Sequence, residues 1–230
     1  MDDRPDRLAN DPWWMFGRLT VGSVFHLAVR LRIEGVELIP AEGAAILAAN
    51  HVSPLDPIAM GLAASRRGRT VRFITASESF DIPLVGWGLR RLRQIPIRRG
   101  TGDRRAVEDA ARVIARGALA GIYPEGGLGS GAELQPAKKG MARLALAAPA
   151  PIVPMGVWGM QRRWPAGGPR LGLPVRPVAA VVVGQPIPAE GDPENEEDVL
   201  ALTDRAMAAI AELVERAKGL TSQRDTSTSQ

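Results

Sequence analysis

Residues 44–56 read Ala-Ala-Ile-Leu-Ala-Ala-Asn-His-Val-Ser-Pro-Leu-Asp, and this stretch decides the fold class. Its first six residues are uncharged and apolar, which is typical of a short strand buried on both faces, and Asp56 opens a helical pattern. A buried strand leading directly into a helix is the unit from which α/β sheets are built. The polar residues Asn50, His51 and Asp56 therefore fall where the strand ends, the edge at which open α/β sheets bind ligands.

The rest of the chain alternates in the same way. Strand patterns occur at 29–35, 71–75, 94–97, 119–123, 152–158 and 178–183, and helical patterns at 56–65, 103–116, 137–148 and from 194 onward, ending near Gly219. We predict a single α/β domain with a mixed, mostly parallel central sheet flanked by helices, preceded by an N-terminal amphipathic interfacial helix. The predicted divisions are 1–28 for that helix, 29–220 for the α/β domain and 221–230 for a disordered tail.

The composition excludes several kinds of site. Hydrophobic residues make up 45% of the chain and charged residues 23%, which is typical of a packed globular protein. The chain has no cysteine and 2 histidines. Disulfide frameworks, cysteine–zinc sites, thiol nucleophiles and three-histidine metal sites are therefore excluded, and we predict no metal site.

Basic residues are concentrated in one part of the chain. Residues 66–105 contain eleven arginines against three acidic residues. Such a segment favours an anionic partner, which is a nucleic acid, an anionic membrane or a phosphorylated small molecule. No nucleic-acid recognition motif or aromatic platform accompanies the arginines, so we predict no nucleic-acid partner.

The N-terminal helix is predicted to begin at Asp11-Pro12, an N-cap followed by proline, with Trp13 and Trp14 directly after. Its polar line holds Arg18, Gly22, His26 and Arg30, and the opposite side holds Trp14, Val21, Phe25 and Ala28. Only 11 residues lie between the two arginines, too few to span a bilayer. The pattern leaves two interpretations open, a helix lying in the membrane surface and a helix packed on the protein's own core.

The pair His51 and Asp56 is the sharpest chemical feature. A carboxylate five residues after a histidine can hold the imidazole in one tautomer and stabilise it after proton uptake, with Pro54 bending the chain between them. This arrangement is a general-base dyad without a nucleophile of its own. The alternative is a structural histidine at a helix start, with Asp56 as an ordinary N-cap.

Two further segments follow predicted strands. Arg98 and Arg99 supply paired guanidinium groups suited to a phosphate, although a solvated turn is the alternative for each taken alone. Glu125, Gly126 and Gly127 supply a carboxylate and accessible backbone N–H groups, with a tight glycine turn as the alternative.

One motif is a false lead. Residues 127–132, Gly-Leu-Gly-Ser-Gly-Ala, match the dinucleotide-binding fingerprint G-x-G-x-x-[G/A]. Pro136 interrupts the helix that should follow at once, and the acidic residue expected about 20 positions further on is missing. We therefore reject a dinucleotide site.

Taken together, the motifs resemble those of the phospholipid/glycerol acyltransferase family, whose best-known members are the lysophosphatidic acid acyltransferases. Asn50-His51 to Asp56 resembles the N-H-x4-D signature of the family. The second, third and fourth blocks are similar to residues 95–99, 123–126 and 151–154, in the same order along the chain.

This resemblance implies an enzyme that moves a fatty acyl group from an acyl thioester to the hydroxyl of a lysophospholipid, with 1-acyl-glycerol-3-phosphate giving phosphatidic acid. The donor would be acyl-CoA or an acyl carrier protein, and no further cofactor is expected. His51 and Asp56 would be catalytic, and substrate binding would fall to Asn50, Arg98, Arg99, Glu125, Gly126 and Gly127. The expected location is the cytoplasmic face of the cell membrane, as a peripheral or monotopic protein on an anionic surface.

The chain also departs from the family pattern. The third block usually continues Gly-Thr-Arg-Ser, whereas Gly127-Leu128-Gly129 stands here in place of the Thr-Arg part, and Arg98 stands where the second block often has an acid. The missing guanidinium leaves the acceptor open, so another lyso-lipid or polar lipid is an alternative. A lipid hydrolase using the same dyad and a non-catalytic membrane-binding scaffold are further alternatives.

Overall fold

The computed structural model describes residues 11–97, 104–129, 133–170 and 176–222. These residues form a seven-stranded sheet in the order β1-β7-β6-β2-β5-β3-β4. The strands are β1 Arg30–Glu34, β2 Ala45–Ala49, β3 Arg72–Ala76, β4 Ile95–Ile97, β5 Leu119–Ile122, β6 Ile152–Trp158 and β7 Val178–Val183. Only β6 and β7 pair antiparallel among the described strands. The prediction of a mixed, mostly parallel sheet is confirmed.

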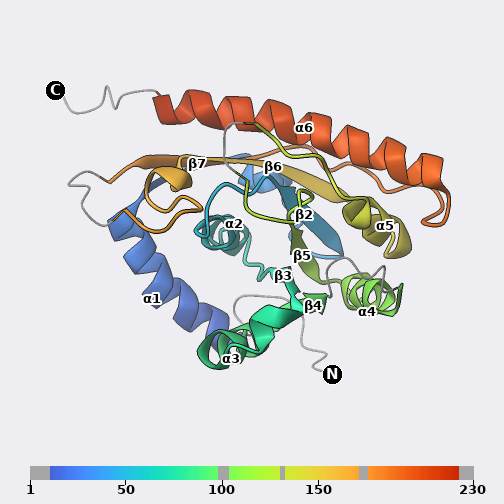
Figure 1. Ribbon diagram of the computed structural model, residues 1–230, viewed down its shortest axis with the longest axis horizontal. Coiled ribbons are helices and arrows are strands. Elements are labelled where there is room, and N and C mark those ends of the chain that lie inside the picture. The colour runs from blue at the N-terminus through green and yellow to red at the C-terminus, as the bar shows by residue number, and fades with distance from the viewer. Residues whose placement is uncertain (1–10, 98–103, 130–132, 171–175, 223–230) are drawn as a thin grey trace.

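Helices cover both faces of this sheet (Figure 1). They are α1 Pro12–Ala28, α2 Asp56–Ser65, α3 Pro83–Arg91, α4 Arg104–Ala115, α5 Gly140–Ala147 and α6 Glu196–Ser222, with short 3-10 helices at Val36–Leu38, Ser77–Phe80 and Met160–Arg162. One apolar cluster joins the sheet to α1 and α2, and a second joins it to α4, α5 and α6. Three layers result, with α6 running along the top of the view in Figure 1 and α1 below the sheet.

Strand β2 lies at the centre of these layers. All five of its residues are buried, because both faces of the strand are covered. Ile46 and Ala48 belong to the cluster under α4–α6, and Ala45, Leu47 and Ala49 to the cluster under α1 and α2. This alternation is the period of two expected of a strand.

The parallel strands carry their carboxyl ends to one edge of the sheet. Asn50 and His51 follow β2 there, and Tyr123 to Glu125 follow the neighbouring β5. Val157 lies near the end of β6 on the other side of β2. Segments that are 74 residues apart in sequence, at His51 and Glu125, are thereby brought side by side.

Helix α3 was not predicted. Gly86 and Gly88 lower the helix propensity of this nine-residue segment, and Pro83 in its first turn was the one available signal. Packing explains one glycine, since a Cβ atom at position 86 would overlap the carbonyl oxygen of Phe80. Tertiary contact, which the sequence pattern does not contain, therefore fixes this helix.

The predicted end of the last helix was too early. Helix α6 continues through Gly219, where the sequence pattern ends it, to Ser222. The Thr221 and Ser222 hydroxyls both donate to the Lys218 carbonyl oxygen, and Thr221 is buried. These contacts carry the helix past a residue that often ends one. Residues 223–230, the rest of the predicted tail, lie outside the described residues.

The predicted orientation of α1 was also wrong in part. Gly22, placed on the polar line by the sequence pattern, is buried with Phe25 and faces Leu62 of α2. Many apolar side chains of α1 are instead exposed, namely Trp13, Met15, Phe16, Leu19, Val21, Val24 and Leu27. Since glycine lets the helix backbone approach α2 closely, it occupies the buried side despite its low hydrophobicity. No helix in the part of the chain described here has the length and apolar character to cross a bilayer.

Some arginines of the basic segment serve the fold. Arg69 is buried and donates to the carbonyl oxygens of Pro40, Gly43 and Gly117. Arg93 forms an ion pair with Asp11 at 2.6 Å. The high positive charge of residues 66–105 is therefore only partly a surface charge, since a sequence count does not separate exposed from buried guanidinium groups.

Candidate active site

His51 and Asp56 lie in direct contact. The Nδ1 atom of His51 is 3.0 Å from Oδ2 of Asp56, and the side chains are 18% and 0% exposed. The backbone N–H groups of Val52 and Ser53 donate to the same oxygen, each at 2.7 Å. The loop thus wraps around a buried carboxylate, and the contact at Nδ1 leaves Nε2 as the ring nitrogen for proton exchange with a substrate.

Burial makes the Asp56 carboxylate costly. Desolvation raises the pKa of Asp56, and the hydrogen bond and positive charge of His51, with the two backbone donors, offset this only in part. Oδ1 has no hydrogen-bond partner within the described structure. The residue is also not the N-cap of α2, because Leu55 occupies that position and Asp56 stands in the first turn. The alternative of an ordinary helix cap is therefore wrong.

The segment after β5 holds the backbone of His51 on both sides. Oε1 of the buried Glu125 accepts from the His51 backbone N–H at 2.8 Å, and Oε2 accepts from Gln135 N at 2.9 Å. The Gly129 N–H donates to the His51 carbonyl oxygen at 2.7 Å. Glu125 thus orders the His51–Asp56 loop, and both of its oxygens already have donors. The sequence pattern does not predict the contact of Gly129, because it depends on the folded position of the His51 backbone.

Asn50 serves the sheet. Its side-chain amide donates to the Val157 carbonyl oxygen at 2.9 Å and accepts from the Val157 N–H at 2.8 Å. The side chain is buried, so it continues the pairing of β2 with β6 beyond the end of β2. Each amide atom therefore has a backbone partner, and contact of Asn50 with substrate stays a prediction.

Of the remaining predicted site residues, the structure describes Gly126 and Gly127. Gly126 has φ +71° and closes a turn by donating to the Tyr123 carbonyl oxygen at 3.0 Å. Its N–H is therefore engaged, while Gly127 lies half-buried at the next position. Arg98 and Arg99 lie outside the described residues. Phosphate binding by the two arginines and substrate binding by Gly127 stay predictions.

A cavity of about 450 Å³ opens beside this site. It begins at Asn50, Val52 and Glu125 and extends to α6. The remaining lining residues are Glu133, Leu134, Trp158, Ala211, Glu212, Val214, Glu215 and Lys218. Walls of valine, leucine, alanine and tryptophan suit an alkyl chain, and the glutamates outnumber the single lysine, which disfavours a phosphate.

Metal chemistry has no cluster to support it in the described residues. They contain no group of three or more histidine, aspartate or glutamate side chains placed to hold a metal ion. The site offers an imidazole, a buried carboxylate and backbone donors. These are groups that general acid–base catalysis uses.

Comparison with known proteins identifies the family to which the chain belongs. The family model named Acyltransferase matches residues 30–158, more than half of the chain. The chain belongs to the acyltransferase family. The match runs from the first residue of β1 to the last residue of β6 and includes the His51–Asp56 loop and the Glu125 segment.

Individual relatives in this family are moderately similar. An uncharacterized protein of Mycobacterium tuberculosis is 32% identical over 149 residues, covering 59% of this chain and 39% of that protein. The chloroplast 1-acyl-sn-glycerol-3-phosphate acyltransferase of Brassica napus is 28% identical over 140 residues, covering 59% and 39%. The 1-acyl-sn-glycerol-3-phosphate acyltransferase of Limnanthes alba is 33% identical over 173 residues, covering 73% and 58%. The matched part thus spans about two fifths of the first two relatives.

A solved structure shares the fold. The crystal structure of the 1-acyl-sn-glycerophosphate acyltransferase PlsC from Thermotoga maritima matches with a TM-score of 0.69 at 20% identity. The match covers 93% of this chain and 81% of that one. The similarity shows that the two chains fold alike.

Proposed function

We propose that this protein transfers a fatty acyl group from an acyl thioester to the hydroxyl of a lysophospholipid, with 1-acyl-glycerol-3-phosphate as acceptor and phosphatidic acid as product. The observation that carries the proposal is the contact of Nδ1 of His51 with the buried Asp56 at the carboxyl edge of the sheet. The plant relatives, which are named 1-acyl-sn-glycerol-3-phosphate acyltransferases, support the choice of acceptor.

His51 acts as general base in this reaction. Its Nε2 removes the proton from the acceptor hydroxyl as the oxygen attacks the thioester carbonyl carbon. The tetrahedral intermediate then breaks its carbon–sulfur bond, and the imidazolium returns the proton to the departing thiolate. Asp56 holds the ring in the tautomer that leaves Nε2 unprotonated at the start and stabilises the imidazolium afterwards. General-base assistance of this kind contributes about 10²- to 10⁴-fold in rate.

The donor is acyl-CoA or an acyl carrier protein, and the scheme needs no resident cofactor. Arg98 and Arg99 bind the acceptor phosphate as paired guanidinium groups. The N–H of Gly127 is the proposed donor to the oxyanion of the intermediate, since the N–H of Gly126 already closes a turn.

The acceptor has one specific alternative. Gly127-Leu128-Gly129 occupies the place of a Thr-Arg pair, and Gly129 packs against the His51 backbone, where a Cβ atom would lie 3.3 Å from the His51 oxygen. A side chain is disfavoured at position 129 because of this close contact. The local packing thus agrees with the absence of an arginine from this segment. This observation favours a second candidate acceptor, a lyso-lipid whose head group is not a phosphate monoester.

The protein works at an anionic membrane surface in this proposal, on the cytoplasmic face. Exposed apolar side chains continue from α1 to α3 and the residue before it, at Ile82, Leu84, Val85 and Trp87. The two helices are joined by the edge-to-face contact of Trp13 with Trp87 at 5.4 Å and by the ion pair of Asp11 with Arg93. We call these exposed residues of α1, Ile82 and α3 the apolar surface. Tryptophan beside exposed leucine is typical of interfacial segments.

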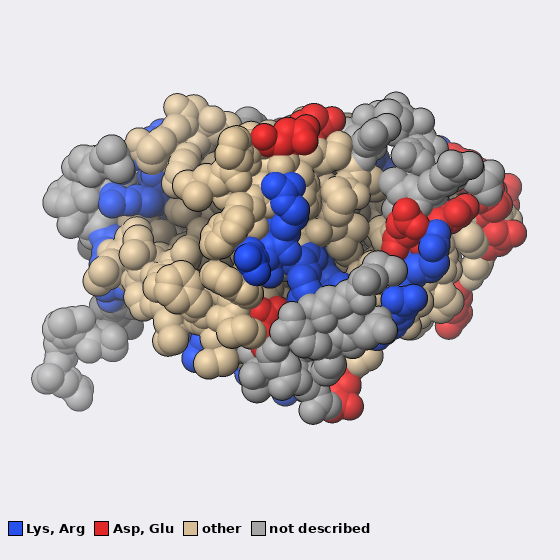
Figure 2. Space-filling model, turned by 90° about the horizontal axis from the view of Figure 1, so that it is seen from below, with Lys and Arg blue, Asp and Glu red and all other residues tan. Residues whose placement is uncertain are grey.

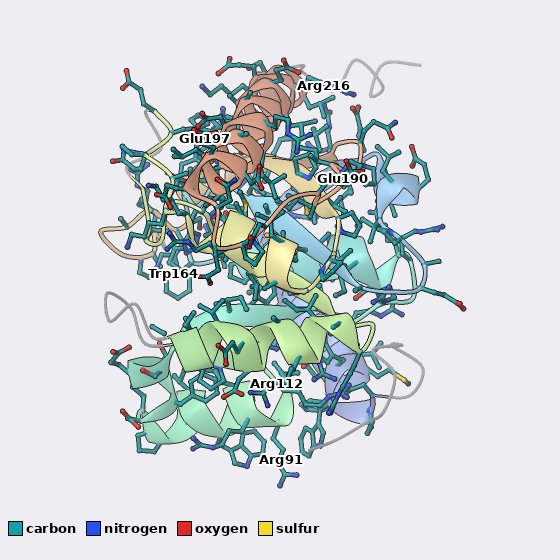
Figure 3. All side chains as sticks on the ribbon, turned by 90° about the vertical axis from the view of Figure 1, so that its right-hand side faces the viewer. Arg91, Arg112, Trp164, Glu190, Glu197 and Arg216 are labelled. Carbon is teal, nitrogen blue, oxygen red and sulfur yellow. The ribbon has the colours of Figure 1, made fainter. Side chains whose placement is uncertain are left out.

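Basic groups accompany the apolar surface. Seen from below, that side of the molecule shows a broad area without charged residues beside a group of Lys and Arg side chains (Figure 2). The Arg91 guanidinium lies over the rings of Trp13 and Trp87, at 5.1 and 5.7 Å from their centroids. Arg91 lies at the opposite end of the molecule from Arg216 of α6 (Figure 3). A cation that contacts two indole rings suits the phosphate level of a bilayer, which supports the proposed orientation.

A crossed assay tests the function. Purified protein is given 1-acyl-glycerol-3-phosphate, lysophosphatidylcholine or a lyso-amino lipid, each with acyl-CoA and with acyl carrier protein, and products are identified by mass spectrometry. We expect phosphatidic acid as the main product. Transfer only to a phosphate-free acceptor would replace the first candidate by the second, and release of free fatty acid despite excess acceptor would indicate a hydrolase.

A further inference from the structure

Tyr123 lies face to face with the catalytic imidazole. The ring centroids of Tyr123 and His51 are 3.9 Å apart with an interplanar angle of 12°. Phe73 of β3 also lies nearly parallel to Tyr123, with ring centroids 6.2 Å apart and an interplanar angle of 7°. Three nearly parallel rings, from β3, from the residue after β5 and from the loop after β2, are thus grouped around Tyr123.

The hydroxyl group of Tyr123 makes no hydrogen bond to the part of the chain that the structure describes. Its oxygen is buried and has no partner among the described residues. Burial, with a smaller effect of the nearby Asp56 charge, raises the pKa of Tyr123 well above its usual value, so the phenol stays neutral. A phenylalanine ring would make the same stack, so the aromatic face is the part of Tyr123 that acts on His51.

The stacked Tyr123 ring restricts the orientation of the imidazole plane, which the hydrogen bond to Asp56 alone does not. One hydrogen bond at Nδ1 fixes a single point of the imidazole and leaves the ring free to tilt about it. A parallel ring at 3.9 Å fixes the plane and thereby the direction of Nε2. The negative face of the phenol ring also attracts the imidazolium more than the neutral imidazole. Both effects favour the state formed when the base takes up the acceptor proton.

We propose that Tyr123 is a positioning residue for His51, whose ring face holds the plane of the imidazole and stabilises its protonated form during acyl transfer. The inference rests on the proposed function, in which His51 is the base. It assigns a role to the first residue of the Tyr123–Gly126 segment, whose Glu125 holds the backbone of the same histidine.

Substitutions separate the ring from its hydroxyl. Tyr123→Leu removes the stack, and we expect kcat to fall about tenfold or more, equivalent to about 1.4 kcal/mol, with KM for the acceptor nearly unchanged. Tyr123→Phe keeps the stack and is expected to stay within about threefold of wild-type kcat. Leu119→Val is the control for general loss of packing, because Leu119 is buried in the strand that leads to Tyr123 and in the same cluster, but is not one of the stacked rings.

A second measurement does not depend on activity. The chain has only 2 histidines, and His26 is exposed on α1, so His51 ring protons are readily assigned in an NMR spectrum. Stacking on Tyr123 predicts upfield-shifted His51 signals in wild type and in Tyr123→Phe. We expect this shift to be lost in Tyr123→Leu and kept in Leu119→Val.

The outcomes distinguish this inference from the proposed function. If wild-type protein transfers acyl groups and Tyr123→Leu has wild-type kcat, the positioning role is wrong and the function stands. Equal losses in Tyr123→Phe and Tyr123→Leu would assign the effect to the hydroxyl and overturn the proposal. Equal losses in Leu119→Val and Tyr123→Leu would reduce it to packing. Stacked NMR signals in a protein without transfer activity would instead contradict the function.

Discussion

At the scale of single residues, Asp56 has a charge where the protein interior disfavours one. It is fully buried, and only one of its oxygens has hydrogen-bond donors. Its pKa is raised, so the folded state binds the proton more readily than the unfolded state does. The penalty is absent below the unfolded pKa and develops as the pH rises through the folded pKa. Such a residue reduces stability at neutral pH in exchange for orienting His51.

Replacing Asp56 by asparagine separates these two effects. The amide oxygen of the new side chain can take the place of Oδ2 and accept from Val52, Ser53 and His51, but a neutral amide does not stabilise the imidazolium as the carboxylate does. We expect Asp56→Asn to lower kcat about 10³-fold while raising the free energy of unfolding at pH 7, with a smaller gain at about pH 4. Denaturant unfolding at both pH values is the measurement. A variant with a lower free energy of unfolding than wild type at pH 7 would show that the carboxylate stabilises the folded state.

At the scale of elements, the turn after β5 holds the loop after β2. Glu125 accepts one backbone hydrogen bond from each of two segments, and Gly129 donates a third to the loop. A rigid sheet edge thus positions His51 through its main chain, while Asp56 and Tyr123 act on its side chain.

Loss of the Glu125 carboxylate should therefore affect both stability and rate. Glu125→Ala leaves two backbone donors without their acceptor, which costs about 2–4 kcal/mol of unfolding free energy. We expect kcat to fall as well, since the His51 backbone loses a fixed point. Glu133→Ala is the matched control, because Glu133 lies on the same cavity and is exposed. Equal unfolding midpoints for the two variants in urea would contradict this role.

Elements with a strong local pattern were predictable. The apolar run 152–158 and the helix 56–65 have the same bounds in the sequence pattern and in the structure. Helix α3 and the last residues of α6 were not, because contacts with other segments and side-chain bonds to the last turn decide them. The His51–Asp56 contact follows from spacing alone, whereas the partners of Asn50 and the stack of Tyr123 depend on which strands become neighbours.

At the scale of the whole molecule, the apolar surface and α6 lie on opposite sides of the sheet (Figure 1). The acidic residues between positions 190 and 215 belong to α6 or to the segment that precedes it. Arg90 and Arg91 are the last two residues of α3. Charge and hydrophobicity are therefore polarised across the molecule. A polarised molecule of this kind has one preferred orientation on an anionic bilayer.

Vesicle binding tests this orientation. Leu84, 80% exposed on α3, should insert its side chain into the bilayer. We expect Leu84→Asp to weaken binding to anionic vesicles about tenfold or more, through lost apolar burial and added repulsion. Leu200→Asp is the matched control, because Leu200 is an exposed leucine on α6. Equal binding of both variants in a sedimentation assay would place the membrane contact elsewhere.

The proposed function depends on His51 as the general base of acyl transfer. The most direct measurement is the single-turnover rate of acyl transfer from acyl-CoA to 1-acyl-glycerol-3-phosphate by wild-type protein and by His51→Ala, with folding of both checked by thermal unfolding. We expect a folded variant whose rate is lower by about 10²- to 10⁴-fold. A folded His51→Ala protein that transfers the acyl group at the wild-type rate would contradict this role of His51.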